Sequence, residues 1–246
     1  MVLRRRLPVS LVALLALWPL SLSAAPVDLA LVLALDVSVS VDRREFELQR
    51  DGLAAAFRDS AVHHAVSSGE HGAVAVTVLL WSGIAQQRIV LPWSRIDGRE
   101  AALGFAARIA GIDRAALPGA TAVGAALLFS ARRFERLPFA SDRRVIDLSG
   151  DGRSNTGPLP PTTHPLLAAA GIVVNALAVE HEDDWLAAYY RREVIRGPGA
   201  FVERAADYAD FRRAILRKLL REIRFTQVTE DTSPPVHRRI AGRQGD

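Results

Sequence analysis

The feature that most constrains the fold is a fully apolar run at residues 29–35, which ends abruptly in the polar segment Asp-Val-Ser-Val-Ser at 36–40. A continuous apolar run of this length is typical of a central strand in a parallel sheet, because such strands are covered on both faces. Similar runs at 74–81, 145–148 and 172–179 alternate with segments of helical periodicity. We therefore expect an α/β fold, a doubly wound, mostly parallel sheet with helices on both faces. The remaining expected elements are helices at 42–58, 97–109, 121–134, 184–194 and 207–223, and short strands at 87–91 and 200–202.

A set of oxygen-bearing side chains follows the ends of the expected strands. In segment 36–40 an acid and two hydroxyls stand at every second position, so their oxygens can face one point. Thr121 adds a third hydroxyl, and its flanking residues Gly119 and Gly124 allow close backbone approach. Asp151 adds a second carboxylate after the run at 145–148. Oxygen ligands alone suit a hard divalent cation, such as Mg2+, Mn2+ or Ca2+.

This set resembles the metal-ion-dependent adhesion site of von Willebrand factor A domains. The pattern maps onto Asp36, Ser38, Ser40, Thr121 and Asp151. The resemblance extends over residues 27–223 and is closest to a bacterial secreted subgroup of unassigned function. It implies a Rossmann-like fold and a cation that leaves one coordination position for an acidic side chain of a partner protein. One departure is Gly150, which stands between Ser149 and Asp151 and displaces the acid relative to the commoner Ser-Asp-Gly form.

The N-terminus has the pattern of a secretory signal. Three arginines at 4–6 precede an apolar stretch at 7–22 and the small residues at 23–25. We expect a signal peptide at 1–25, a von Willebrand A-like domain at 26–224 and a flexible polar tail at 225–246. The protein would then be secreted or periplasmic, without stable membrane insertion after cleavage. A retained anchor is the alternative, but the apolar stretch is short for a span of about 20 residues.

Composition limits the classes of partner and chemistry that we expect for this chain. The formal charge of +4 includes the three arginines of the expected signal, so the remaining chain is close to neutral and no nucleic-acid partner is expected. The chain has no cysteine, which excludes disulfides and thiol chemistry. The histidines show no metal-ligand spacing and are interpreted as surface or loop residues. Trp81, Trp93 and Trp185 are interpreted as core anchors, with exposure for binding as an alternative for Trp93, and Asp147 as an acid that pairs or packs locally.

Two other functions remain open beside metal-dependent protein binding. A phosphatase of the haloacid dehalogenase type would use Asp36 as nucleophile, but the acid expected two residues later is Ser38. The only lysine, Lys218, lies in the last expected helix. We therefore expect no catalytic residues and no enzyme. The other alternative is a scaffold whose metal only stabilises the fold, in which case loss of Asp36 would lower stability without affecting a partner.

Overall fold

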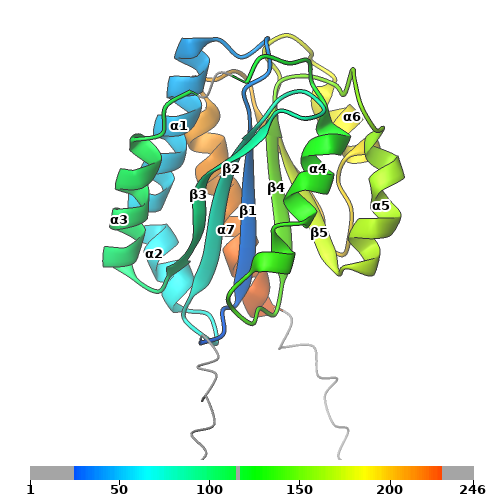
Figure 1. The fold of residues 1–246 in the computed structure, drawn as a ribbon. Helices are drawn as coiled ribbons and strands as arrows, with labels where there is room; N and C mark the ends of the chain where they lie inside the picture. The colour runs from blue at the N-terminus through cyan, green and yellow to red at the C-terminus, as the bar shows by residue number, and fades with distance from the viewer. Residues whose placement is uncertain (1–24, 115–116, 229–246) are drawn as a thin grey trace, which may run out of the picture.

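The computed structural model describes residues 25–114 and 117–228. Six strands form one sheet in the order β3-β2-β1-β4-β5-β6, in which β3 is antiparallel to β2 and the other neighbours are parallel (Figure 1). The strands are β1 (Leu29–Asp36), β2 (Val74–Trp81), β3 (Gln87–Ile96), β4 (Arg144–Gly150), β5 (Ile172–Val179) and β6 (Val202–Ala205). The helices are α1 (Arg43–Arg58), α2 (Ser60–Ser67), α3 (Arg99–Ala110), α4 (Val123–Ala131), α5 (Pro160–Ala169), α6 (Leu186–Glu193), α7 (Phe211–Val228) and the 3-10 turn η1 (Phe134–Arg136).

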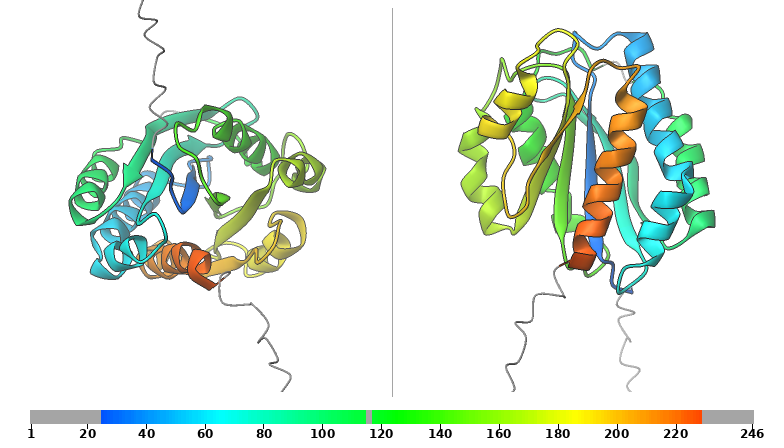
Figure 2. Two further views of the ribbon diagram at one scale, coloured as in Figure 1. Left: turned by 90° about the horizontal axis from the view of Figure 1, so that it is seen from below. Right: turned by 180° about the vertical axis from the view of Figure 1, so that it is seen from behind.

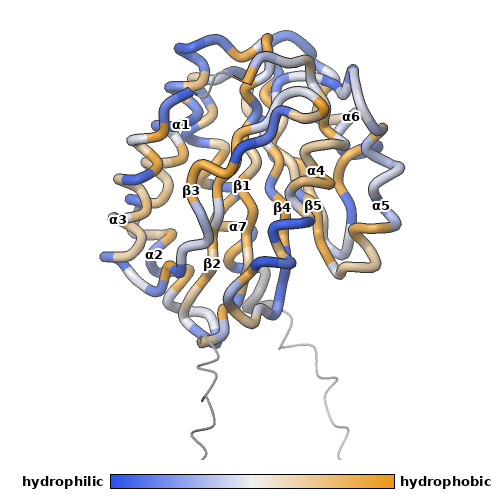
Figure 3. The backbone as a smooth tube through the Cα atoms, in the orientation of Figure 1, coloured by the Kyte–Doolittle hydropathy of each residue, from blue (hydrophilic) through white to orange (hydrophobic). Residues whose placement is uncertain are grey.

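The sheet lies between two layers of helices. Helices α1, α2, α3 and α7 cover one face, and α4, α5 and α6 cover the other (Figure 2). Strand β1 serves both layers because successive side chains point to opposite faces: Leu31 and Leu33 pack into the first core, Val32 and Ala34 into the second. Strands β1, β2 and β5 are accordingly among the most continuously apolar segments of the described residues (Figure 3). The predicted doubly wound α/β fold is confirmed.

Most predicted elements lie where the sequence places them, and β2 and β5 match residue for residue. Two helices were not predicted. A single residue, Asp59, separates α2 from α1, because it turns the chain and caps the new helix by accepting a hydrogen bond from the Ala61 amide at 2.8 Å. Helix α5 starts at a proline and contains Pro165, a residue that normally argues against a helix.

Two elements, β3 and α7, run five residues past their predicted ends, and the other ends differ by smaller amounts. Strand β3 continues through Pro92 to Ile96, which an edge strand tolerates because its outer amides need no partner. Helix α7 begins at Phe211 and runs to Val228, past residue 224, where we placed the end of the domain. The predicted signal peptide at 1–25 and the rest of the predicted tail, from 229 onward, lie outside the described residues apart from Ala25. Within the described ranges, no helix is both long and apolar enough to cross a membrane.

Two residue interpretations are corrected. His63 is buried rather than on the surface, and its Nε2 lies 2.8 Å from the carbonyl oxygen of Phe57. Trp185 is 72% exposed and anchors no core, whereas Trp81 is fully buried as predicted. The Trp185 prediction failed because hydropathy alone does not show which loop residues are left uncovered.

Candidate metal centre

The predicted site residues lie at the carboxyl end of the parallel strands, the upper end of the sheet in Figure 1. Asp36 is the last residue of β1, and Asp151 follows the last residue of β4. The two strands are neighbours, so their terminal loops meet. Thr121 stands just before α4. This is the edge where open α/β sheets bind ligands.

Four of the five predicted ligands form one chain of hydrogen bonds. Asp36 Oδ1 accepts from the Ser38 amide at 2.8 Å. The Ser38 and Ser40 hydroxyl oxygens lie 3.1 Å apart, and the Ser40 hydroxyl donates to Asp151 Oδ1 at 2.8 Å. The structure therefore brings the acids of two separate strands together through two serines.

Thr121 lies beside the loop that carries Asp151, as its backbone contacts with Asn155 and its proximity to Gly152 show. Its amide donates to Asn155 Oδ1 at 2.9 Å, and the Asn155 amide donates to the Thr121 carbonyl at 2.9 Å. A methyl group on Gly152 would lie 3.5 Å from Thr121 Oγ1, so the threonine hydroxyl faces the loop that carries Asp151. Asn155 thus fastens the Thr121 segment to the loop after β4, a role that sequence reasoning missed.

The glycines around Thr121 are required by close backbone contact, as predicted. A Cβ on Gly119 would lie 2.6 Å from the Gly83 amide nitrogen, and one on Gly124 would lie 2.1 Å from the Pro158 carbonyl oxygen. No side chain fits at either distance. Gly150, the departure from the Ser-Asp-Gly form, also stands in close contact. A Cβ on this residue would lie 3.0 Å from Asp36 Oδ2.

The electrostatics of the site call for a positive charge. Asp36 is fully buried, and its Oδ2 accepts no hydrogen bond from any described residue. Burial, followed by the charge of Asp151, raises the pKa of Asp36 to about 8. Burial also raises the pKa of Asp151, against the hydrogen bond from Ser40. A divalent cation would satisfy the orphaned oxygen and stabilise the ionised form of both acids, so this donor set fits a hard metal ion.

Three contacts that sequence analysis did not predict, one buried and two partly buried, support the site. The Gln49 side chain of α1 donates to the Asp36 carbonyl at 3.0 Å, and the Tyr190 hydroxyl of α6 donates to the Gly152 carbonyl at 3.0 Å. Arg114 donates to the Val41 carbonyl at 2.8 Å. A glutamine on the apolar stripe of α1 was a readable signal for the first contact.

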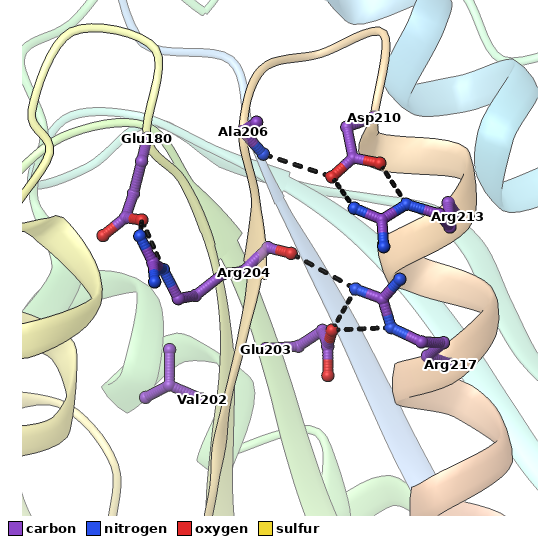
Figure 4. A pocket seen from close by; sticks show the side chains of 8 residues that line it. All are labelled: Glu180, Val202, Glu203, Arg204, Ala206, Asp210, Arg213 and Arg217. Atoms are coloured by element: carbon purple, nitrogen blue, oxygen red, sulfur yellow. Dashed lines mark hydrogen bonds and ion pairs between the residues drawn. The ribbon is translucent and has the colours of Figure 1, made fainter.

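A second polar feature of the described chain is a cavity of about 400 Å³ between β6 and α7 (Figure 4). Its charged side chains form the ion pairs Glu180–Arg204, Glu203–Arg217 and Asp210–Arg213. Every arginine in the cavity has an acidic partner, so the cavity offers a ligand little uncompensated charge.

The lysine required by the phosphatase alternative is buried away from the site. Lys218 Nζ lies 2.7 Å from Asp147 Oδ1 and 2.6 Å from Glu222 Oε1, and the side chains of the lysine and its nearest acids are buried. The local pairing predicted for Asp147 is confirmed. The lysine therefore holds α7 to β4 inside the core and has no access to a substrate at the strand ends.

Comparison with known proteins gives a family and a fold. A family model described as a protein of unknown function, DUF1194, matches residues 26–227. No curated protein matches the chain. Among solved structures, proximal thread matrix protein 1 from the mussel byssus matches 80% of this chain and 47% of its own, with 14% identity and a TM-score of 0.59.

Two further solved structures bear on the site. The same mussel protein with a zinc-occupied metal-ion-dependent adhesion site matches 82% of this chain and 48% of its own, at 16% identity and a TM-score of 0.57. The pilus adhesin SpaC from Lactobacillus rhamnosus GG matches 81% of this chain and 31% of its own, at 13% identity and a TM-score of 0.55. This chain spans less than half of each of these proteins. The fold is that of von Willebrand factor A domains, and these neighbours are matrix or adhesion proteins rather than enzymes.

Proposed function

The chain belongs to the DUF1194 family of proteins of unknown function, and from the site itself we propose that it is a metal-dependent protein-binding module. One divalent cation, which we propose to be Mg2+, with Mn2+ or Ca2+ as substitutes, would be held at the carboxyl end of the sheet. The proposed ligands are Asp36, Ser38, Ser40, Thr121 and Asp151. The cation would in turn hold an acidic side chain of a protein partner.

The observation that carries the proposal is the buried, unpartnered Oδ2 of Asp36 beside a second carboxylate. Leaving such an atom without a partner costs several kcal/mol unless a cation satisfies it. The five side chains offer only oxygens, of which some would act through water. When bound, the cation supplies a positive point charge with one exchangeable position. A carboxylate from a partner completes such a shell and adds specificity.

The surroundings of the motif favour a protein as the partner. Val39, Ile84, Leu159 and Trp185 are all largely exposed, and each lies in a loop at the same end of the sheet. Ile84 is close to the Thr121 segment, because a Cβ on Gly157 would lie 3.1 Å from Ile84 Cγ1 and 3.6 Å from the Ala122 Cβ. Exposed apolar side chains around a polar centre are typical of protein interfaces. The mussel matrix protein and the pilus adhesin are consistent with this class of function.

The N-terminal pattern supports a location outside the cytoplasm for this function. We propose that the segment at 1–25 directs export and that residues from 26 onward form the folded module, which meets its partner in the periplasm or outside the cell. No contact with nucleic acid or with membrane lipid is part of this function.

The proposed function is tested with paired peptides. The metal-free protein and its Mg2+-loaded form are titrated over an immobilised peptide that carries glutamate at its centre. The same titration is made over the peptide that carries glutamine instead, and the bound protein is measured. Asp36→Ala removes the proposed metal ligand, and Glu47→Gln removes a partly exposed carboxylate of α1 as a control. We expect only the glutamate peptide to bind, only with metal, and only to the wild type and the control. Equal binding of both peptides, or binding without metal, would refute the proposal.

A further inference from the structure

A second group of metal-ligating side chains lies at the opposite end of the sheet. Asp28 stands just before β1, His71 in the loop before β2 and Asp142 just before β4. One ligand atom of each residue lies within 4.8 Å of the others. We propose that these three residues form a separate site for zinc or a similar transition metal, which fastens the amino ends of three neighbouring strands.

The site is built around a buried carboxylate. Asp28 is only 3% exposed, and the chain from 69 to 73 wraps around it. Its Oδ1 accepts from the His71 amide at 2.8 Å, and its Oδ2 accepts from the Ala73 amide at 3.1 Å. Residue 69 must be glycine, because a Cβ there would lie 2.3 Å from Asp28 Oδ2. These contacts fix the orientation of the carboxylate and leave each oxygen a second lone pair.

The charges around Asp28 are not balanced by a permanent cation. In residues 25–114 and 117–228, the Asp28 carboxylate has hydrogen bonds from two backbone amides and no ion pair with a lysine or arginine. The only basic side chain in the group is His71, whose Nε2 lies 3.2 Å from Asp142 Oδ2. Two carboxylates therefore lie within 4.8 Å of a single imidazole, which pairs only with Asp142, and the other carboxylate, that of Asp28, is buried. A buried carboxylate in this setting is stabilised by a cation that contacts both acids.

The ligand types select the metal. One imidazole nitrogen with two carboxylate oxygens suits zinc and its first-row neighbours, whereas Mg2+ and Ca2+ prefer oxygen alone. Asp142 is half exposed, so water can reach a fourth position. The three ligands come from positions that are far apart in sequence but adjacent in the strand order β2-β1-β4. A metal held here would resist separation of these strands, which gives it a structural role.

The test separates this site from the one at the carboxyl end. The background protein carries Asp36→Ala, so that zinc at the first site does not contribute. In this background, zinc binding is measured by calorimetry, and thermal unfolding is followed with and without zinc. The test variants are His71→Ala and Asp142→Asn. His64→Ala is the control, because His64 is an exposed histidine of the nearby helix α2.

We expect the background and the control to bind one zinc ion and to unfold at a higher temperature with zinc. His71→Ala and Asp142→Asn should each weaken binding by at least about 100-fold and abolish the thermal shift. Unchanged zinc affinity in both variants, or no zinc binding by the background protein, would overturn the proposal and leave the His71–Asp142 contact as a simple ion pair. Neither result affects the proposed function, which is measured with Mg2+ and depends on Asp36.

Discussion

Replacing Gly150 by alanine should damage the site through steric contact alone. The new Cβ would lie 2.6 Å from the Tyr190 hydroxyl oxygen, 3.0 Å from Asp36 Oδ2 and 3.4 Å from Trp81 Cζ2. All three side chains are fully buried, so none can swing away into solvent. Gly150 has no positive φ, so alanine brings no backbone strain. Overpacking of this kind costs about 1–3 kcal/mol.

Two effects partly offset each other in this variant. Alanine restricts the unfolded chain, which stabilises the protein by about 0.4–1 kcal/mol. We therefore expect a net loss of about 1–2 kcal/mol in the free energy of unfolding. The closest contact that alanine would make with the metal ligands is with Asp36, so Mg2+ affinity should also fall by at least about tenfold, which corresponds to about 1.4 kcal/mol.

The matched control is Gly104→Ala in α3, where a Cβ would meet nothing within 4 Å. That change should stabilise the protein by about 0.5–1 kcal/mol. Urea unfolding followed by circular dichroism measures both variants, and calorimetry measures their Mg2+ affinity. The reasoning is refuted if Gly150→Ala is as stable as the wild type and binds Mg2+ with wild-type affinity.

Two further predictions follow from the buried charges. Lys218→Met should cost about 3–5 kcal/mol in urea unfolding at neutral pH, because it leaves Asp147 and Glu222 buried without their counter-charge; Arg213→Met, which breaks an exposed pair, should cost less than about 1 kcal/mol, and equal losses would contradict the argument. The pKa of Asp36 is about 8, so below this pH its carboxyl is protonated in the metal-free protein and must release that proton to bind a cation. Apparent Mg2+ affinity should therefore rise about 50-fold between about pH 6 and pH 8, and a flat profile in calorimetry would show that Asp36 is already ionised.

The fold was predictable because strands β1, β2, β4 and β5 are buried along almost their whole length. The apolar runs of β1, β2 and β5 needed no tertiary information to be recognised. The missed helices depend on local details that average composition hides: the Asp59 cap starts α2, and α5 keeps Pro165 inside a helix. Periodicity alone does not reveal either.

The two candidate sites also differ in how far the sequence alone could predict them. The carboxyl-end motif was visible because three of its residues alternate within one five-residue segment and the others lie next to a strand end or a helix start. Its supports were less visible: Gln49 stood out only as a polar residue on the apolar stripe of α1, and Asn155 gave no signal, since both side chains bind backbone atoms. The group of Asp28 and His71 was missed because its members lie at strand starts, and no regular spacing links them. Only the strand order brings them together.

The central claim is that the motif holds a divalent cation, and calorimetric titration of the metal-free protein with Mg2+ and Ca2+ tests it most directly. Asp36→Ala and Asp151→Ala are measured beside the wild type, with folding checked by circular dichroism. We predict saturable one-to-one binding to the wild type and none to either folded variant. Absence of binding to the wild type, or unchanged binding to both variants, would contradict the claim.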